Sequence, residues 1–363
     1  MTQFYEKILK PALFKLPAET AHEIGLESLR VSLASPAARK LAAKRFQVAP
    51  FGELTRFGLK FKNPLGIAAG FDKNGRVVNQ LAALGFGFVE VGTVTYDPQR
   101  GNPKPRLFRL PGDGALINRL GFNNQGTQQV VERLRKLRPE CVLGVNIGKN
   151  KDVPNEAATE NYLKSFDLAY GVADYIAVNI SSPNTPNLRD LQNSENLEEL
   201  IGALQSRNRE LGNGSLKPLL VKIAPDLSTL EIETITDICM RLDVAGIIAT
   251  NTTIKRDGLT TVGVGELGAG GLSGKPLREV SNQVISTIYR CSGGKMPIVG
   301  VGGIFTAADA FDKIAAGACL LQAYTGFVYG GISFAREINV GLAQLIKDAG
   351  FATLDDAVGS GSK

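Results

Sequence analysis

Histidine is almost absent from this chain of 363 residues, which contains only His22. That residue lies far along the sequence from every glycine-rich segment, so a Ser-His-Asp triad or a metal centre built from several histidines is hard to assemble. We therefore expect no bound metal. Any proton chemistry must use serine, lysine, asparagine, tyrosine or a carboxylate.

Cysteine is also scarce. The four cysteines show no Cys-x-x-Cys spacing and lie in or beside apolar segments: Cys141, Cys239, Cys291 and Cys319. This pattern favours reduced, buried thiols in a cytosolic compartment over disulfides or a metal site.

Long hydrophobic runs are missing too. No run approaches the roughly 18 consecutive apolar residues of a spanning helix, and Met1–Lys10 lacks the apolar region of a signal peptide. The sequence predicts a protein that neither spans a membrane nor is exported.

Residues 1–50 differ from the rest in charge and periodicity. Eight basic residues accompany four acidic ones there, which gives +4 of the chain's net charge of +6. Apolar residues recur at helical spacing, which predicts short amphipathic helices broken near Pro11, Pro17 and Pro36. A basic amphipathic segment of this kind is a candidate for lying on an anionic membrane surface. The alternative is a helical cap on the main domain with a solvated charged face.

The remainder alternates strand-like and helix-like segments. Eight apolar runs predict strands: Leu65–Ala69, Phe86–Val91, Val142–Ile147, Tyr175–Ile180, Leu219–Ile223, Gly246–Ala249, Ile298–Val301 and Leu320–Ala323. Helical patterns lie between them, at Gln125–Leu137, Leu197–Glu210, Leu230–Leu242, Leu277–Tyr289 and Ala307–Ala316. We predict an α/β fold, a (β/α)8 TIM barrel over residues 51–350 with residues 1–50 as a helical extension. Residues 351–363 form a C-terminal tail whose last five residues we expect to be disordered. A doubly wound open sheet is the alternative.

Polar residues recur where these strands end. Seven of the eight predicted ends carry an amide, a hydroxyl or a lysine. The carboxyl ends of barrel strands meet on one face, so these groups predict a ligand site there.

The fourth strand end is the richest. Asn179-Ile-Ser-Ser-Pro-Asn-Thr-Pro-Asn187 follows an apolar run and presents amides and hydroxyls, while Pro183 and Pro186 fix the backbone. An Asx or Ser turn that closes a strand is the simpler reading of this stretch alone.

Glycine, with 41 residues, is abundant near the last two strand ends. Gly270-Gly-Leu-Ser-Gly274, Gly300-Val-Gly-Gly303 and Tyr324-Thr-Gly326 resemble a phosphate cradle built from backbone N–H groups. Phosphate sites are common after strands 7 and 8 of such barrels.

A set of motifs in one order resembles the dihydroorotate dehydrogenases, specifically the membrane-associated, quinone-reducing class. The motifs are Ala68-Ala-Gly-Phe-Asp-Lys73, Val91-Gly-Thr-Val-Thr95, Asn118-Arg-Leu-Gly-Phe-Asn123, Val145-Asn-Ile-Gly-Lys149, Asn179-Ile-Ser-Ser-Pro-Asn184, Thr250-Asn-Thr252 and Gly271-Leu-Ser-Gly274. The resemblance extends from the N-terminal helices to about residue 345. Phe71 stands where leucine is common in the family.

The resemblance implies FMN as cofactor and oxidation of dihydroorotate to orotate, a step of pyrimidine synthesis, with hydride transfer to flavin N5. It implies Ser182 as the base, where the soluble class has cysteine. It places FMN at Ala68, Ala69, Gly70, Phe71, Asp72, Thr93, Asn146, Asn179, Lys222, Thr250, Gly274, Gly303, Tyr324 and Thr325. It places the substrate at Lys73, Asn118, Arg119, Leu120, Gly121, Phe122, Asn123, Asn179, Asn184, Asn251 and Thr252.

The same resemblance gives the N-terminal helices a role. They would cover an apolar tunnel for a membrane quinone, with His22 and Arg109 near the quinone head. It implies a peripheral protein on the cytoplasmic face of the cell membrane, with no nucleic acid partner. Three rival interpretations remain: the soluble class, a flavin-free lyase or isomerase that forms a Schiff base at Lys73 or Lys222, and a non-catalytic membrane-surface module. The soluble class lacks the basic extension and the serine. The membrane-surface module leaves the polar strand ends unexplained.

Overall fold

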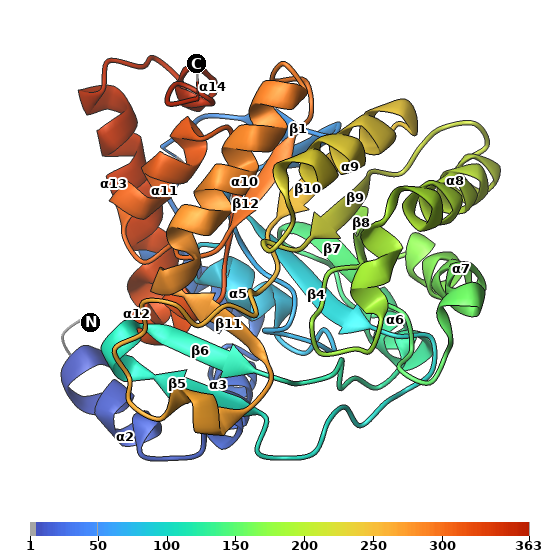
Figure 1. The fold of residues 1–363 in the computed structure, drawn as a ribbon. Helices are drawn as coiled ribbons and strands as arrows, with labels where there is room; N and C mark the ends of the chain where they lie inside the picture. Colours follow the sequence, from blue (N-terminus) through green and yellow to red (C-terminus); the bar gives the residue numbers. More distant parts are fainter. Residues whose placement is uncertain (1–4, 49, 363) are drawn as a thin grey trace.

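The computed structural model of this chain describes residues 5–48 and 50–362. Its centre is a closed barrel of eight parallel strands in the order β10-β12-β13-β3-β4-β7-β8-β9 (Figure 1). The strands are β3 (Leu65–Ile67), β4 (Phe88–Val94), β7 (Val142–Ile147), β8 (Tyr175–Asn179), β9 (Leu219–Ile223), β10 (Gly246–Ala249), β12 (Ile298–Val301) and β13 (Leu320–Ala323). The predicted TIM barrel is confirmed, and its strands coincide with the eight apolar runs within a few residues at each end.

Helices cover the outside of the barrel. They are α5 (Val78–Ala83), α6 (Thr127–Arg135), α7 (Ala158–Tyr170), α8 (Ser194–Leu211), α9 (Thr229–Arg241), α10 (Arg278–Cys291), α11 (Ala307–Ala315), α12 (Thr325–Gly330), α13 (Phe334–Asp348) and α14 (Leu354–Ala357). Short 3-10 turns are η2 (Pro111–Asp113), η3 (Asn155–Ala157), η4 (Leu188–Gln192), η5 (Val264–Leu267), η6 (Lys275–Leu277) and η7 (Gly331–Ser333). Local sequence sets several starts: Ser228 and Glu231 form a capping box at α9, and Thr306 and Asp309 form another at α11.

A β-hairpin closes the amino end of the barrel. It consists of β1 (Leu54–Arg56) and β2 (Leu59–Phe61). The Phe61 ring packs edge-on against Phe88, the first residue of β4, with centroids 5.4 Å apart.

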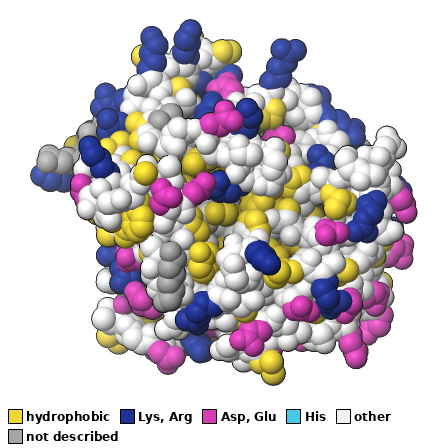
Figure 2. Space-filling view, turned by 90° about the horizontal axis from the view of Figure 1, so that it is seen from above, with side chains coloured by type: hydrophobic (Ala, Val, Ile, Leu, Met, Phe, Trp, Pro, Cys, Tyr) yellow, Lys and Arg dark blue, Asp and Glu magenta, His cyan; other side chains and the backbone are white. Residues whose placement is uncertain are grey.

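Figure 2 views the molecule from the top of Figure 1 and shows apolar side chains at the centre of that face, with charged side chains of both signs around them.

A three-stranded antiparallel sheet lies beside the carboxyl end of the barrel. Its strands are β5 (Leu107–Leu110), β6 (Ala115–Asn118) and β11 (Gly271–Gly274), in the order β11-β6-β5. Because β6 and β11 are more than 150 residues apart in sequence, no local pattern predicted their pairing.

The N-terminal segment is helical, as expected, but one predicted break is wrong. A π-helical turn, η1 (Tyr5–Leu9), leads directly into α2 (Lys10–Phe14), so Pro11 lies in the first turn of a helix, where its missing N–H is tolerated. The other breaks are present, because α3 (Ala18–Ser32) follows Pro17 and α4 (Pro36–Phe46) begins at Pro36. Figure 1 shows α2 and α3 beside β5 and β6.

The expected disorder at the end of the chain is wrong for residues 359–362. The Ser362 side chain is buried, and its hydroxyl bonds to the Ser286 hydroxyl and the Ala316 carbonyl at 2.8 and 3.0 Å. These bonds hold the segment against the barrel helices. Lys363 is outside the described residues.

Within the described residues, no helix combines the length and apolar character needed to cross a bilayer.

Candidate active site

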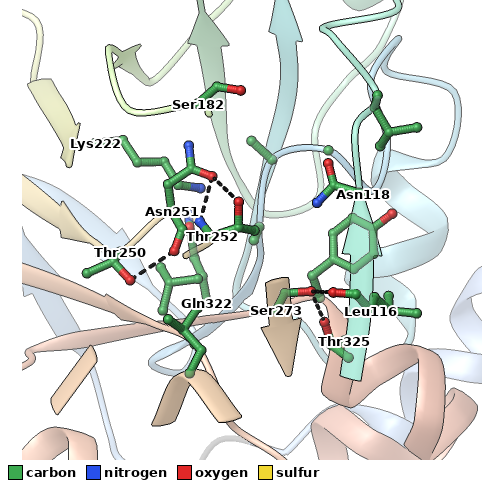
Figure 3. A pocket seen from close by; sticks show the side chains of 18 of the residues that line it. Leu116, Asn118, Ser182, Lys222, Thr250, Asn251, Thr252, Ser273, Gln322 and Thr325 are labelled. Carbon is green, nitrogen blue, oxygen red and sulfur yellow. Dashed lines mark hydrogen bonds between the residues drawn. The ribbon is translucent and has the colours of Figure 1, made fainter. Parts of the chain in front are cut away.

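A cavity opens at the carboxyl ends of the barrel strands and is closed on one side by β6 and β11 (Figure 3). About 1040 Å³ of space free of protein atoms lies within it, part of which is open to solvent. Ser182, Lys222 and Asn251 line it from the barrel, and Asn118 and Thr325 line the other side. The predicted convergence of polar strand ends on one face is therefore present in the fold.

The loop after β8 delivers Ser182 to this cavity. Asn179 is the last residue of β8, and the buried Ser182 hydroxyl accepts a hydrogen bond from the Asn184 backbone N–H at 3.3 Å. The Asn184 amide donates to Asn118 Oδ1 at 3.1 Å, which fastens the loop to β6. The Thr185 hydroxyl is buried without a hydrogen-bond partner. An unpaired buried hydroxyl is costly, so this group is available to a ligand or a water.

A ladder of polar side chains crosses the floor of the cavity. The Asn251 amide donates to Asn179 Oδ1 at 3.2 Å, and the Asn179 amide donates to the Thr93 hydroxyl at 2.8 Å. The Thr93 hydroxyl donates to Asn146 Oδ1 at 2.6 Å, and the Asn146 amide donates to Glu90 at 2.8 Å. These bonds join the loop after β10 to strands β8, β4 and β7, so the side chains that face the cavity are held in fixed orientations.

Two lysines reach the cavity. Lys222 on β9 is 5% exposed, and its ammonium donates no hydrogen bond to any described residue. Burial lowers its pKa, and the charge of Glu90 acts against that shift. Burial also lowers the pKa of Lys73 to about 8, while the carboxylates of Glu19 and Glu23 act to raise it. Near neutral pH Lys73 is mainly an ammonium, suited to an anionic ligand.

Glycines shape the wall nearest β12 and β13. Gly303 has φ 76°, and a Cβ there would lie 2.5 Å from the Cβ of Arg278. Gly274 has φ 105°, and a Cβ there would lie 2.7 Å from the Cα of Ala115. Ser273 and Thr325 hydroxyls meet at 2.9 Å across the same wall. Both glycines line the cavity beside this pair of hydroxyls, and neither position has room for a side chain.

A second cavity, largely apolar, lies under α2 and α3. It shares Leu107, Leu116 and Tyr324 with the first cavity, so these three side chains separate the two spaces. The His22 ring lies 5.1 Å from Phe71 in an edge-on contact, and burial with the nearby Lys73 charge lowers its pKa to about 3. The Arg109 guanidinium stacks 4.6 Å from the Phe14 ring and donates to the Leu13 carbonyl at 3.0 Å.

Comparison with known proteins identifies the family. A sequence model described as dihydroorotate dehydrogenase matches residues 53–346. The chain belongs to the dihydroorotate dehydrogenase family.

Relatives named dihydroorotate dehydrogenase (quinone) match almost the whole chain. The Mycobacterium marinum protein is 48% identical over 97% of this chain and 96% of its own length. The Mycolicibacterium smegmatis protein is 48% identical over 98% of each chain. A crystal structure of the Eimeria tenella enzyme in complex with ferulenol superposes with a TM-score of 0.82, at 39% identity over 90% of this chain and 94% of that one. The resemblance inferred from the motifs, including its quinone-dependent class, is confirmed.

Most residues that the family resemblance selected line the first cavity. They are Ala68, Ala69, Gly70, Lys73, Thr93, Asn118, Leu120, Gly121, Phe122, Asn179, Ser182, Asn184, Lys222, Thr250, Asn251, Thr252, Gly274, Gly303, Tyr324 and Thr325. His22 and Arg109 both line the second cavity.

Five selected residues do not line the first cavity. Phe71 faces the second one, and Asn146 lies behind Thr93. The Asp72 carboxylate accepts from the Arg76 and Val77 backbone N–H groups, which fixes the turn before α5. The Arg119 side chain donates to the Ala269 carbonyl at 3.1 Å, and Asn123 lines a separate surface hollow. The Asp72 and Arg119 side chains thus hold loops of the fold, and their roles toward FMN and the substrate stay predictions.

Sequence reasoning missed several groups at the site. Gln322 and Ser273 line the cavity, and Glu90 lies buried beneath it. A signal was present, because Glu90 and Gln322 each interrupt an apolar strand, in Phe88-Val-Glu-Val91 and Leu320-Leu-Gln-Ala323. A polar residue inside such a run needs a buried partner.

Proposed function

We propose that this chain oxidises dihydroorotate to orotate in pyrimidine synthesis, with FMN as its cofactor and a membrane quinone as electron acceptor. Membership of the family, relatives named as quinone-dependent, and two adjoining cavities of different polarity support the proposal. FMN, when bound, supplies the hydride acceptor for C6 of the substrate.

The first cavity has the groups that FMN requires. Lys222 presents an ammonium that donates to no acceptor among residues 5–48 and 50–362, which suits negative charge on the pyrimidine edge of a reduced flavin. The glycines at 274 and 303 suit a phosphate because they line the same cavity as the Ser273 and Thr325 hydroxyls, so backbone N–H groups and hydroxyls are available together. Thr93, Thr250 and Tyr324 would complete the FMN contacts.

Ser182 is proposed as the base that accepts the C5 proton. A serine hydroxyl is a weak base at neutral pH, so it needs a route by which its own proton leaves. The unpaired Thr185 hydroxyl in the same loop, with a water, suits that relay. Pro183 and Pro186 limit movement of the loop, which favours a fixed distance between base and substrate.

The substrate carries a carboxylate and a ring edge of amide-like groups. Lys73 supplies a cation, and asparagine side chains can both donate to and accept from such an edge. The amides that would do this come from β6, β8 and the loops after β8 and β10: Asn118, Asn179, Asn184 and Asn251.

The second cavity is proposed as the quinone site. It is mainly apolar, adjoins the first cavity through Tyr324, and holds His22 and Arg109 as polar groups for a quinone oxygen. The lowered pKa of His22 keeps its ring neutral near pH 7, so one ring nitrogen can donate and the other accept.

The N-terminal helices are proposed to hold the protein peripherally on the cytoplasmic face of the membrane. Apolar side chains are exposed on them, including Ile8 at 56%, Val31 at 62% and Leu41 at 72%. Basic residues such as Lys40 and Lys44 lie on the same segment, and anionic headgroups attract such a combination.

The single observation that carries the proposal is the buried Lys222, whose ammonium donates to no acceptor of the described residues, in the same cavity as Ser182. The test is anaerobic addition of dihydroorotate to the purified protein, followed by a soluble quinone. We expect a yellow protein whose visible flavin absorbance bleaches and then returns. A colourless protein that borohydride traps on a carbonyl substrate would instead support Schiff-base chemistry at a lysine.

A further inference from the structure

Glu90 is a buried carboxylate that the proposed reaction does not use. It lies in the middle of β4 and is 0% exposed, between Val89 and Val91, which are also fully buried. Placing a carboxylate inside a barrel is costly unless the fold compensates it. A group kept there is a candidate for a role in the site above it.

Three neutral donors compensate the carboxylate. The Asn146 amide donates to one oxygen at 2.8 Å. The Tyr175 hydroxyl and the Gln322 amide donate to the other at 2.9 and 2.7 Å. Burial, together with the Glu90 charge, holds the pKa of Tyr175 well above its usual value, so the phenol remains a neutral donor.

Lys222 is the cation that responds to this charge. Glu90 is the only charged group of the described residues that shifts the pKa of Lys222 apart from burial itself. Yet none of the ion pairs within 4 Å among the described residues joins the two, although Lys222 lines the cavity. Neutral groups donate to the carboxylate instead, and they take three of its roughly four acceptor positions.

We propose that Glu90 is a positioning residue for Lys222: its carboxylate, held by three neutral donors, favours the ammonium from a distance without forming an ion pair with it, so the lysine stays free to face the cofactor. A direct ion pair would satisfy the lysine and withdraw it from the ligand. A charge at longer range favours the ammonium without engaging its N–H groups. This inference rests on the proposed function, because the flavin is its reporter.

The test is the pH dependence of flavin reduction by dihydroorotate, with the flavin midpoint potential, in four holoenzymes: parent, Glu90→Gln, Lys222→Met and the double variant. The rate should fall as pH rises and Lys222 loses its proton, and in Glu90→Gln this fall should begin at lower pH than in the parent. The rate should decrease about tenfold for each unit by which the Lys222 pKa lies below the assay pH. The potential should become more negative. Both effects should vanish in the Lys222→Met background, because Glu90 acts through that lysine.

Tyr175→Phe is the matched control, since it removes one donor to Glu90 but keeps the charge. Its pH profile should follow the parent. A flavin-loaded Glu90→Gln with the parent's profile and potential, or an equal effect with and without Lys222, would overturn the inference. If Glu90→Gln does not retain flavin, parent and Lys222→Met decide: the potentials of the two proteins should differ at neutral pH, because the parent's lysine is charged there. Equal potentials at neutral pH would contradict the inference.

Failure of the proposed function gives a different result. A parent protein that binds no flavin, or whose flavin dihydroorotate does not reduce, contradicts the function itself. A reducible parent with an unchanged Glu90→Gln contradicts only the role of Glu90.

Discussion

The Glu19 carboxylate lies 2.7 Å from the Arg106 guanidinium, and this ion pair joins the first turn of α3 to the segment that precedes β5. Arg106 also donates to the carbonyls of Arg100 and Asn102, and the Asn102 amide donates to Arg119 O at 3.0 Å. The N-terminal helix is thereby connected to the strand that carries Asn118. The pair links the proposed quinone cover to the substrate side of the site.

Glu19→Gln should loosen this connection. Burial acts to raise the pKa of Glu19, but the hydrogen bonds and charge of Arg106 outweigh it and leave the pKa below its usual value. The pair therefore stabilises the fold above the ordinary carboxyl range and loses that effect as pH falls through the lowered pKa. We expect about 1–3 kcal/mol less stability at pH 7 in urea unfolding, and a larger loss of quinone turnover than of flavin reduction.

The control is Glu27→Gln. Glu27 is an exposed carboxylate on α3, the helix that carries Glu19, and it pairs with Arg30 and Arg76. Surface pairs contribute little, so stability and quinone turnover should stay close to the parent. Equal losses in both variants would show that the Glu19 pair has no special role.

Ser182→Ala should keep FMN but slow flavin reduction by about 10²–10⁴-fold, because the proposed base is removed while the flavin contacts remain. Stopped-flow absorbance under anaerobic conditions measures the rate. Ser182→Cys is the companion variant, since a thiol can become a thiolate at moderately alkaline pH and should recover part of the rate there. Reduction of Ser182→Ala at the parent's rate would remove Ser182 from the mechanism.

Lys222→Met should slow flavin reduction by about 10²-fold or more, because a cation placed for the reduced flavin is lost. Lys313→Met is a matched control: this lysine is also fully buried, but it donates to the Ser281 hydroxyl at 3.0 Å and to Asn282 at 2.7 Å, between α10 and α11. It should lower stability without changing the flavin spectrum or potential. The assignment fails if both variants alter the flavin equally.

His22 should make the fold sensitive to mild acid. Burial, and then the Lys73 charge, lower the pKa of His22 in the folded protein to about 3. At a pH below the ordinary histidine pKa, the unfolded chain therefore binds a proton that the folded protein does not. Stability is unaffected above about pH 6.5 and falls below it, by at most about 1.4 kcal/mol per pH unit. Urea unfolding of the parent and of His22→Gln between pH 7 and 5 measures this. The parent should lose more stability than the variant, and parallel curves would contradict the lowered pKa.

Removal of residues 1–45 should abolish quinone reduction and membrane association while FMN binding and flavin reduction are better retained. The truncation deletes α2 and α3, which cover the second cavity, but leaves the first cavity's lining complete. Sedimentation with anionic vesicles and turnover with a soluble quinone are the measurements. A truncated protein with full quinone turnover would refute the role of the helices.

The sequence by itself determined the barrel and the order of its site loops. Apolar runs such as Val142–Ile147 and Leu219–Ile223 became strands with the expected bounds, because buried parallel strands need continuous apolar residues. The barrel also places the polar residues after Asn179 and Ala249 close together, since all of its strands end on one face. A ligand site at those ends could therefore be predicted from the sequence.

Only the tertiary structure decided which members of each motif face the cavity. In Asn118-Arg119-Leu120 the arginine turns away to the Ala269 carbonyl while its neighbours line the cavity, an outcome set by the pairing of β6 with β11. The connection from Glu90 to the site likewise depends on donors from Asn146, Tyr175 and Gln322, which lie on three other strands. Local patterns report burial and turns, but which distant segments satisfy a buried charge is fixed only when the barrel closes.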